Sequence, residues 1–352
     1  MACPKRKIII ASIILLLVAA LAIFFGKSYC VYQQFLEQTD LTAEKFKEML
    51  DAAVNLPTKS TDGKTNFLLL GTDTLEYRAS DYPLTDTIML GSLDLASGTL
   101  NLLSLPRDIY LPEINKKINA IYPSFYQESS TSALAQTTSK ISELTEIPIH
   151  YSAVINMADL ADFLDLIGGV QVTIDNSFTD HQFPREGVDV TTVTDPAILY
   201  ETVSFASGEA QLNAVQALQF MRSRHGDGNE GNDYARSRRQ QKVLTAVASQ
   251  VIARLKQELS NLDFTFLGQL YQFYQERYQE QIPFEELLAL GRDYLLANKQ
   301  LTMQSHSLAI SPGEAGASLQ EVEASWRNGN QWSLSIINRP ALLQEIKNKL
   351  AL

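Results

Sequence analysis

An uncharged apolar run close to the N-terminus most constrains how this chain can fold. Residues 8–25 contain no charge and no proline, and only one polar side chain. As a helix rising about 1.5 Å per residue, the run would be roughly 27 Å long, close to the thickness of a bilayer's hydrocarbon core. Basic residues at 5–7 precede it and only Lys27 directly follows it. The positive-inside rule therefore predicts a cytoplasmic tail at 1–7 and a transmembrane anchor at 8–26, with the remainder extracytoplasmic.

A cleaved signal peptide is the competing interpretation of this run. The apolar region of a signal peptide is usually about 7–15 residues long and ends at a small-residue cleavage site. Here Ala20 and Ala22 are followed by further apolar residues, and Cys30 follows Tyr29 rather than a small residue. An anchor is therefore favoured over cleavage or lipid attachment.

The portion after the predicted anchor is acidic. The whole chain has 29 Lys and Arg against 40 Asp and Glu, a net charge of −11, and residues 28–352 alone carry −15. Phosphate backbones repel such a surface, so nucleic-acid binding is not expected. Cys3 and Cys30 are too few and too poorly placed for a disulfide scaffold or a zinc site. A hydrophobic fraction of 45% is ordinary for globular domains.

A helical stalk is expected directly after the anchor. Apolar residues within 29–56 recur at spacings of three and four, up to Pro57. The following stretch, 59–64, is polar and rich in turn-forming residues. Together these features predict a juxtamembrane helical stalk and linker over residues 27–63.

Beyond the linker, strand-like and helix-like segments are interspersed. Strands are expected at 66–71, 87–93, 99–105, 151–155, 170–174, 300–310 and 331–337. Helices are expected at 131–146, 157–167, 209–221, 233–259, 283–297 and 340–350. This order predicts an α/β fold with a central mixed sheet flanked by helices.

A basic cluster stands out within the acidic portion. Residues 222–242 hold six basic and three acidic side chains, a local net charge of +3. On a helix beginning near Asn232, Asp233, Arg236 and Gln240 share one face, because they recur at i, i+3 and i+7. The planar fork of arginine suits phosphate or carboxylate oxygens. This face could therefore bind an anion; the alternative is a solvated helix with local ion pairs.

Charged side chains also stand at the ends of predicted strands. Arg107 and Asp108 directly follow the strand at 99–105, where a sheet can hold side chains rigidly. Asp73 follows the first strand and Asp86 precedes the second, so a loop of twelve residues can bring both carboxylates to one sheet edge. Such a pair suits Mg²⁺ with substrate phosphate oxygens. General acid and base, or a helix cap and a turn residue, are the alternatives.

Several common kinds of site are disfavoured by missing motifs. The four histidines are scattered, with no HxxxH or HxH pair, so a histidine zinc site is not expected. The chain contains no GxSxG, GxxxxGK[ST] or GxGxxG. This lowers the expectation of an α/β-hydrolase, a P-loop NTPase or a dinucleotide-binding enzyme.

Eight short segments, taken in order, resemble the motifs of the LytR-CpsA-Psr family. They are FLLLGTD at 67–73, TDTIML at 85–90, SLPRD at 104–108, KINA at 117–120, GGV at 168–170, LNAVQAL at 212–218, RSR at 222–224 and DYARSRRQQ at 233–241. Each motif alone is a weak signal, but eight in the family's order are specific. The resemblance spans about residues 64–260, and the single anchor matches the family's usual layout.

The resemblance implies a fold and an activity. The fold is the family's α/β/α arrangement, with a catalytic domain at 64–260 that residues 261–352 complete. The activity is that of an extracytoplasmic bacterial phosphotransferase, single-pass in the plasma membrane. Such enzymes transfer an anionic glycopolymer, a teichoic acid or capsular-type polysaccharide, from a polyprenyl pyrophosphate carrier to peptidoglycan, typically to the C6 hydroxyl of N-acetylmuramic acid. The lipid tail lies in an apolar groove.

The resemblance also implies roles for particular residues. Asp73 and Asp86 would hold Mg²⁺, with Mn²⁺ as an alternative. The implied catalytic residues are Asp73, Asp86, Arg107, Arg222, Arg224, Asp233 and Arg236. The implied pyrophosphate-binding residues are Arg107, Lys117, Arg222, Arg224, Arg236, Gln240 and Arg78. Arg78 stands later than the arginine that the family often has after its first aspartate, and Ile109 replaces a common threonine.

Two other functions fit the same residues. The site could hydrolyse the lipid pyrophosphate, with water as the acceptor, because no motif identifies acceptor recognition. The chain could also be a non-catalytic anchored protein that binds wall polymer or has a regulatory role. DNA binding fits poorly, because the predicted cytoplasmic tail has only about seven residues.

Overall fold

The structure is a computed structural model. It describes residues 26–72, 84–185, 187–188, 192–278, 280–310, 318–324 and 332–352. Apart from Gly26, the predicted anchor at 8–26 lies outside this part, as do Asp73 and Arg78. In the part that is described, no helix is both long and apolar enough to span a bilayer.

Helices and strands are interspersed along the described chain. A helix over residues 26–39 is followed by Ala43–Asn55 (α2), Ile121–Glu128 (α3), Ser130–Thr145 (α4), Met157–Ile167 (α5), Pro196–Leu199 (α6), Ala214–Arg222 (α7), Asp233–Asn261 (α8), Thr265–Arg277 (α9), Phe284–Ala297 (α10) and Arg339–Leu350 (α11). Short 3₁₀ turns cover Ile118–Ala120 and Gly228–Glu230. The strands are Lys64–Thr72 (β1), Thr85–Asp94 (β2), Thr99–Ser104 (β3), Tyr110–Leu111 (β4), Lys116–Lys117 (β5), Tyr151–Asn156 (β6), Val170–Ile174 (β7), Phe178–Pro184 (β8), Tyr200–Phe205 (β9), Gly208–Leu212 (β10), Thr302–Ser307 (β11), Leu319–Val322 (β12) and Ser333–Ile336 (β13).

A five-stranded mixed sheet in the order β11-β3-β2-β1-β6 forms the centre of the fold. β2 pairs antiparallel with both β1 and β3, whereas β6 and β11 add in parallel at the two edges. β2 is buried along most of its length because both sheet faces are covered. The prediction of an α/β fold with a central mixed sheet flanked by helices is confirmed.

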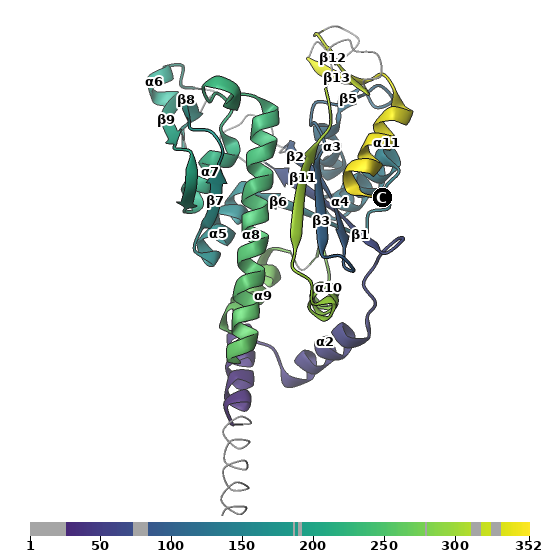
Figure 1. Ribbon diagram of the computed structural model, residues 1–352, viewed down its shortest axis with the longest axis vertical. Helices are drawn as coiled ribbons and strands as arrows, with labels where there is room; N and C mark the ends of the chain where they lie inside the picture. Colours follow the sequence, from purple (N-terminus) through teal and green to yellow (C-terminus); the bar gives the residue numbers. More distant parts are fainter. Residues whose placement is uncertain are drawn as a thin grey trace, which may run out of the picture.

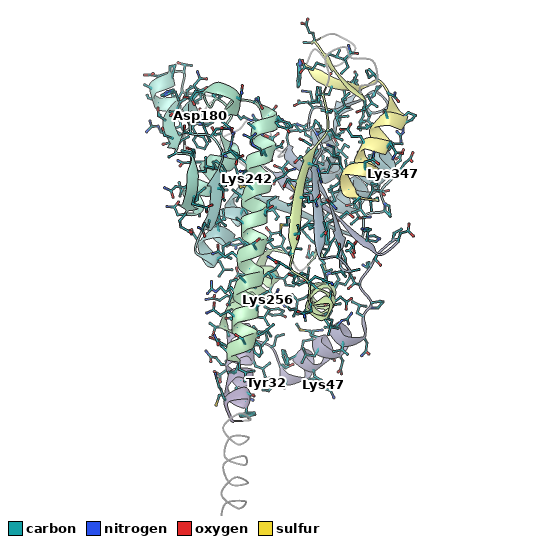
Figure 2. The ribbon with its side chains drawn as sticks, in the orientation of Figure 1. Tyr32, Lys47, Asp180, Lys242, Lys256 and Lys347 are labelled. Atoms are coloured by element: carbon teal, nitrogen blue, oxygen red, sulfur yellow. The ribbon has the colours of Figure 1, made fainter. Side chains whose placement is uncertain are left out.

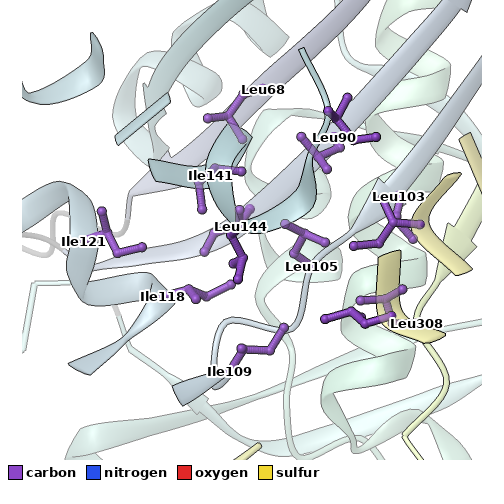
Figure 3. Packing of buried hydrophobic residues seen from close by; sticks show 14 of the residues in the cluster. Leu68, Leu90, Leu103, Leu105, Ile109, Ile118, Ile121, Ile141, Leu144 and Leu308 are labelled. Atoms are coloured by element: carbon purple, nitrogen blue, oxygen red, sulfur yellow. The ribbon is translucent and has the colours of Figure 1, made fainter. Parts of the chain in front are cut away.

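One face of this sheet packs against α3, α4 and α11. Figure 3 shows Leu68, Leu90 and Leu103 from neighbouring strands meeting Ile141 and Leu144 of α4. Leucine and isoleucine at alternate strand positions point to the same face, and their burial drives this packing. The C-terminal helix α11 closes the cluster, so the last part of the chain is integral to the sheet domain.

A second lobe lies beside the sheet, on the other side of α8 (Figure 1). It contains α5, α7 and two small antiparallel sheets, β7 with β10 and β8 with β9. Its apolar cluster includes Leu164, Phe178 and Phe220 and continues onto Val243 of α8. α8 therefore belongs to the core of this lobe while it also contacts β11 of the central sheet.

The end of the molecule nearest the predicted anchor is built from α2, α9, α10 and the helix over 26–39 (Figure 1). The Lys27 ammonium donates to the Asn261 carbonyl oxygen at 2.7 Å, which ties the start of that helix to the end of α8. Gln38 donates to the Thr265 carbonyl oxygen at 3.0 Å. Between α2, α8, α9 and α10 lies a groove of about 580 Å³ whose lining is almost entirely apolar.

Two sequence predictions about helices are wrong. The single helix expected at 29–56 is interrupted, because Asp40 adopts a left-handed conformation (φ 53°) and Thr42 caps a new helix. The helix expected at 209–221 begins with strand β10, which pairs with β7. Asn213 then starts α7 with a capping box that includes Gln216, so the helix could not extend further back.

Candidate functional site

Two small cavities meet at the N-terminal end of α8. One has a volume of about 80 Å³ and opens between the central sheet and α8. The other, of about 160 Å³, opens toward the second lobe. Asp86, Arg236 and Gln240 line both cavities. Predicted site residues from separate parts of the chain are therefore brought together here.

Asp86 is the acidic centre of the site. Its Oδ1 accepts a hydrogen bond from Arg107 Nη1 at 2.6 Å, and its Oδ2 lies 3.5 Å from Arg224 Nη2. Burial raises the pKa of Asp86, but Arg107, Arg224 and Arg236 together lower it by more than burial raises it. The pKa of Asp86 therefore lies below its ordinary value. Asp86 is therefore a carboxylate throughout the neutral pH range.

A tight turn after β3 presents Arg107. The Ile109 amide donates to the Pro106 carbonyl oxygen at 3.2 Å and the Asn119 amide donates to that of Arg107 at 3.3 Å, so the backbone is held from two sides. Burial lowers the pKa of Arg107, but Asp86 and other carboxylates raise it above the ordinary value. Arg107 is therefore fixed in place as a permanent cation.

Asp108 and Lys117 form a second layer behind Arg107. Asp108 is buried, and its Oδ2 lies 3.4 Å from Arg107 Nε while its Oδ1 accepts from Lys117 Nζ at 2.6 Å. Asp108 lines the smaller cavity, whereas Lys117 lines neither of the two. The structure thus directs Lys117 to Asp108, and its contact with pyrophosphate stays a prediction.

Arg236 is the most deeply buried of the arginines that line the two cavities. It is only 5% exposed, and its Nε has no hydrogen-bond partner among the described residues. Its Nη1 lies 3.1 Å from Asp233 Oδ1. Burial, followed by repulsion from Arg224, lowers the pKa of Arg236 to about 10. A buried guanidinium with an unused donor favours an anionic ligand at this position.

The start of α8 explains how Arg236 and Gln240 reach the site. Asn232 caps the helix by accepting from the Ala235 amide at 2.8 Å. Asp233 then occupies the first turn, where a negative charge is favourable. Arg236 and Gln240 follow one and two turns later and are both buried. The shared helix face predicted from the sequence is therefore present.

Arg222 ends α7, and Arg224 follows it in the segment between α7 and α8. Both line the larger cavity. The Arg222 guanidinium lies 5.6 Å from the centre of the Phe183 ring, within range of a cation–π contact. Arg224 extends toward Asp86. Arginines from three places in the sequence thus surround a single carboxylate.

The predicted metal site is only partly within the described residues. Asp86 is present, whereas Asp73 and Arg78 lie outside. Over the described ranges, no group of three or more His, Cys, Asp or Glu side chains could hold a metal ion. One carboxylate at a phosphate-type pocket is still compatible with Mg²⁺, which keeps several waters and takes substrate oxygens as ligands.

Sequence reasoning missed several residues of this region. Tyr234 and Trp332 line the smaller cavity, and Tyr200 and Asp180 line the larger one. Trp332 comes from the C-terminal stretch, where no motif was recognised. Tyr200 and Asp180 come from β9 and β8, which the sequence did not predict. Tyr234 lies within the DYARSRRQQ motif at 233–241 but was not singled out, and no periodic pattern or spacing pointed to the other three.

The arrangement can bind a multiply charged anion and stabilise charge that develops on it. Four guanidinium groups, those of Arg107, Arg222, Arg224 and Arg236, line the two cavities. Preorganised cations in a partly buried pocket stabilise charge without reorganising, which is the main requirement of phosphoryl transfer. The pocket is therefore suited to a phosphate or pyrophosphate group.

Comparison with known proteins gives consistent matches. The chain is 29% identical over 249 residues to the polyisoprenyl-teichoic acid–peptidoglycan teichoic acid transferase TagU of Enterococcus faecalis, covering 70% of this chain and 71% of that protein. It is 23% identical over 238 residues to TagU of Bacillus subtilis, covering 66% and 65%. The match thus spans about two thirds of the length of these relatives.

Solved structures share the fold. The crystal structure of B. subtilis TagV matches with a TM-score of 0.52 at 19% identity, covering 83% of this chain and 99% of that one. The LytR-CPS2A-psr family protein YwtF (TagT) with bound octaprenyl pyrophosphate lipid matches with a TM-score of 0.50 at 17% identity, covering 84% and 94%. A sequence model of the family matches residues 29–333, which confirms the resemblance seen in the motifs. The chain belongs to the LytR_cpsA_psr family.

Proposed function

We propose that this chain transfers an anionic glycopolymer from a polyprenyl pyrophosphate carrier to peptidoglycan. The observation that carries the proposal is the buried Arg236, with an unused Nε donor, beside Asp86, Arg107 and Arg224. Burying this many guanidinium groups together is unfavourable unless an anion joins them. The named activity of the TagU relatives and the pyrophosphate lipid bound by TagT support the same ligand.

In the proposed reaction, a hydroxyl of the acceptor attacks the phosphorus nearest the sugar. A new O–P bond forms, the bond between the two phosphates breaks, and polyprenyl phosphate leaves while the hydroxyl proton is released. Arg107, Arg224 and Arg236 hold the phosphate oxygens and stabilise the charge that develops on them. Gln240 adds an amide donor on the same helix face. The acceptor we propose is the C6 hydroxyl of N-acetylmuramic acid.

We propose that Asp86, together with Asp73, holds Mg²⁺ or Mn²⁺. Bound there, the metal would neutralise charge on the pyrophosphate. The donor type fits, since a carboxylate with substrate oxygens and no thiolate or imidazole suits these cations.

We also propose that residues 8–26 anchor the chain in the plasma membrane with the site outside the cytoplasm. The lipid tail would occupy the apolar groove between α2, α8, α9 and α10. Leu288→Trp would fill part of this groove. It should weaken binding of a long-chain prenyl pyrophosphate by about tenfold and leave a two-isoprene analogue unaffected, because only the long chain reaches the groove.

The proposal is tested with the full chain in detergent, a prenyl pyrophosphate-linked oligosaccharide and a peptidoglycan oligomer. Products are identified by mass spectrometry, with and without chelator. A phosphodiester-linked conjugate would establish transfer, and its loss with chelator would establish the metal. Sugar phosphate without conjugate would instead establish hydrolysis, and bound but unchanged substrate would establish a binding protein.

Substitutions then link the activity to the site. Asp86→Ala and Arg107→Ala should each lower turnover by at least about 100-fold, because each removes charge stabilisation at the reacting phosphate. Arg254→Ala is the matched control, since Arg254 lies on α8 with its guanidinium 4.0 Å from the centre of the Phe266 ring and lines neither cavity. Full activity in both site variants would overturn the assignment.

A further inference from the structure

One buried carboxylate holds the backbone that carries Arg224. Asp180 on β8 is only 1% exposed (Figure 2 labels it in the second lobe). Its Oδ2 accepts from the Ser223 hydroxyl at 2.6 Å and from the backbone amides of Arg224 and His225 at 3.1 Å each. Its Oδ1 accepts from the Gln182 amide at 2.9 Å. Three consecutive residues thus bond to one side chain that is over forty positions away in the sequence.

Arg239 also holds this backbone. Its Nη2 donates to the Ser223 carbonyl oxygen at 2.6 Å and its Nε donates to that of Phe220 at 2.9 Å. The Arg239 guanidinium is itself fixed, because it lies 4.7 Å from the centre of the Phe178 ring and donates to Glu230 Oε2 at 2.8 Å. Ser223 is therefore held by hydrogen bonds to both its hydroxyl and its carbonyl group.

Hydrogen bonds fully occupy the Oδ2 atom of Asp180. Four neutral donors bond to its carboxylate, and three of them converge on Oδ2. A carboxylate oxygen that accepts three hydrogen bonds has no lone pair left for a metal ion or a transferred proton. Its charge instead strengthens the bonds to the backbone amides, since hydrogen bonds to an ionised acceptor are stronger.

We propose that Asp180 is a positioning residue of the pyrophosphate site, which fixes residues 223–225 so that Arg224 reaches Asp86 and the phosphate oxygens. The inference rests on the proposed function for the identity of the ligand. The effect of Asp180 on the backbone of residues 223–225 is independent of the proposed function, because it can be measured without any ligand. Asp180 lies at the edge of the larger cavity, but its Oδ2 is bonded to residues 223–225, so we expect its effect to pass through Arg224.

Asp180→Asn is the sharpest variant. Asparagine keeps the size of the side chain, but with its oxygen toward the three Oδ2 donors it offers them a neutral acceptor and places its NH₂ group against the Gln182 amide. The lobe should still fold, because the Asp227 amide donates to the Thr179 carbonyl oxygen at 3.0 Å and the Thr179 amide donates to Asp227 Oδ1 at 2.9 Å. β8 therefore stays attached to the segment between α7 and α8.

The first measurement is amide hydrogen exchange of the ligand-free full chain. In Asp180→Asn, the amides of Arg224 and His225 should exchange about tenfold faster, because each then bonds to a neutral amide oxygen, a weaker acceptor than a carboxylate. Amides of β1 and β2 should exchange at the wild-type rate. Unchanged exchange at residues 224 and 225 would overturn the proposal whether or not the site binds pyrophosphate.

The second measurement is the affinity for geranylgeranyl pyrophosphate in a double-mutant cycle. Asp180→Asn and Arg224→Ala should each weaken binding by about tenfold, and the double variant should bind no more weakly than Arg224→Ala alone. When Asp180→Asn is combined with Arg107→Ala, in contrast, the two fold-losses of affinity should multiply. If the fold-losses of affinity also multiply in the double variant with Arg224→Ala, Asp180 acts by another route and the proposal is overturned.

Asp195→Asn is the matched control. Asp195 also accepts a backbone hydrogen bond in the second lobe, from the Ala197 amide at 2.9 Å, but it lines neither cavity. This variant should retain wild-type affinity and wild-type exchange at residues 224 and 225. If the wild-type chain fails to bind the probe, the proposed function fails, and the exchange measurement alone decides the role of Asp180.

Discussion

At the N-terminal end of α8, Arg236 keeps a positive charge that its surroundings oppose. Its pKa is lowered to about 10 from the ordinary 12.5, by burial and then by repulsion from Arg224. A cation whose pKa is lower in the folded state destabilises the fold at every pH below that value. The destabilisation is relieved as the pH rises through about 10, or at neutral pH when an anion binds.

Arg236→Met should therefore separate stability from binding. We expect the free variant to be more stable than wild type by about 1–3 kcal/mol, because the opposed charge is removed. Saturating inorganic pyrophosphate should raise the melting temperature of wild type by several degrees and leave that of the variant unchanged. Thermal unfolding followed by circular dichroism checks both effects. A destabilised variant that still responds to pyrophosphate would contradict this account.

The charge of Asp86 has the opposite effect on the stability of the fold. Its pKa is lower in the folded chain than the ordinary value of 3.8, so its charge stabilises the fold above that pH. This contribution is lost as the pH falls through the folded-state pKa. Asp86→Asn should lower the free energy of unfolding by about 1–3 kcal/mol at pH 7 and by less near pH 3. Urea unfolding of both chains at several pH values tests this pH dependence. A difference in the free energy of unfolding that does not change with pH would argue against it.

Which site residues the sequence could predict depends on how local their placement is. Asp86 and Arg107 stand at strand ends, and Arg236 and Gln240 follow from helical spacing, so short-range patterns located all four. Asp180 could not be found in this way. The partners of its Oδ2 atom lie over forty residues away, and its strand contains a register irregularity between Asp180 and Phe183 that breaks the alternating pattern.

At the level of elements, the boundaries of α5 were predicted well because both of its ends are capped. α5 covers the expected 157–167 because Asn156 accepts from the Asp159 amide at 2.7 Å and Gly168 ends the helix at φ 82°. β10 was mistaken for helix because its residues also suit a helical pattern. Only pairing with β7, over thirty residues earlier, decides its conformation.

The junction between β7 and β10 depends on Gly169. Gly169 has φ +79°, and a Cβ there would lie 2.3 Å from the Leu212 carbonyl oxygen. Gly168 has φ +82° but open space around it, which makes it a matched control. We expect Gly168→Ala to cost about 1 kcal/mol from backbone strain alone, and Gly169→Ala to cost about 2–4 kcal/mol. Chemical denaturation measures both, and equal losses would show that the close approach is unimportant.

At the scale of the whole molecule, the last fifty residues complete the sheet domain. β11 pairs with β3 along its length, and Leu342, Ile346 and Leu350 of α11 are buried in the core. A chain ending at residue 300 should lack a cooperative thermal transition and bind a hydrophobic dye, because one sheet edge and one core face are uncovered. A chain ending at residue 350 should melt like wild type. Cooperative unfolding of the shorter chain would refute this role.

The length of α8 has a geometric consequence. Its 29 residues extend about 43 Å, from the arginine pocket at one end to the Lys27 contact at the other. With the anchor proposed above, and with α8 along the bilayer normal, we expect α8 to act as a fixed spacer between bilayer and pocket. The pyrophosphate must then be lifted clear of the lipid headgroups before it can react. Wall strands lying flat against the membrane are out of range, so the spacer selects acceptors by their height.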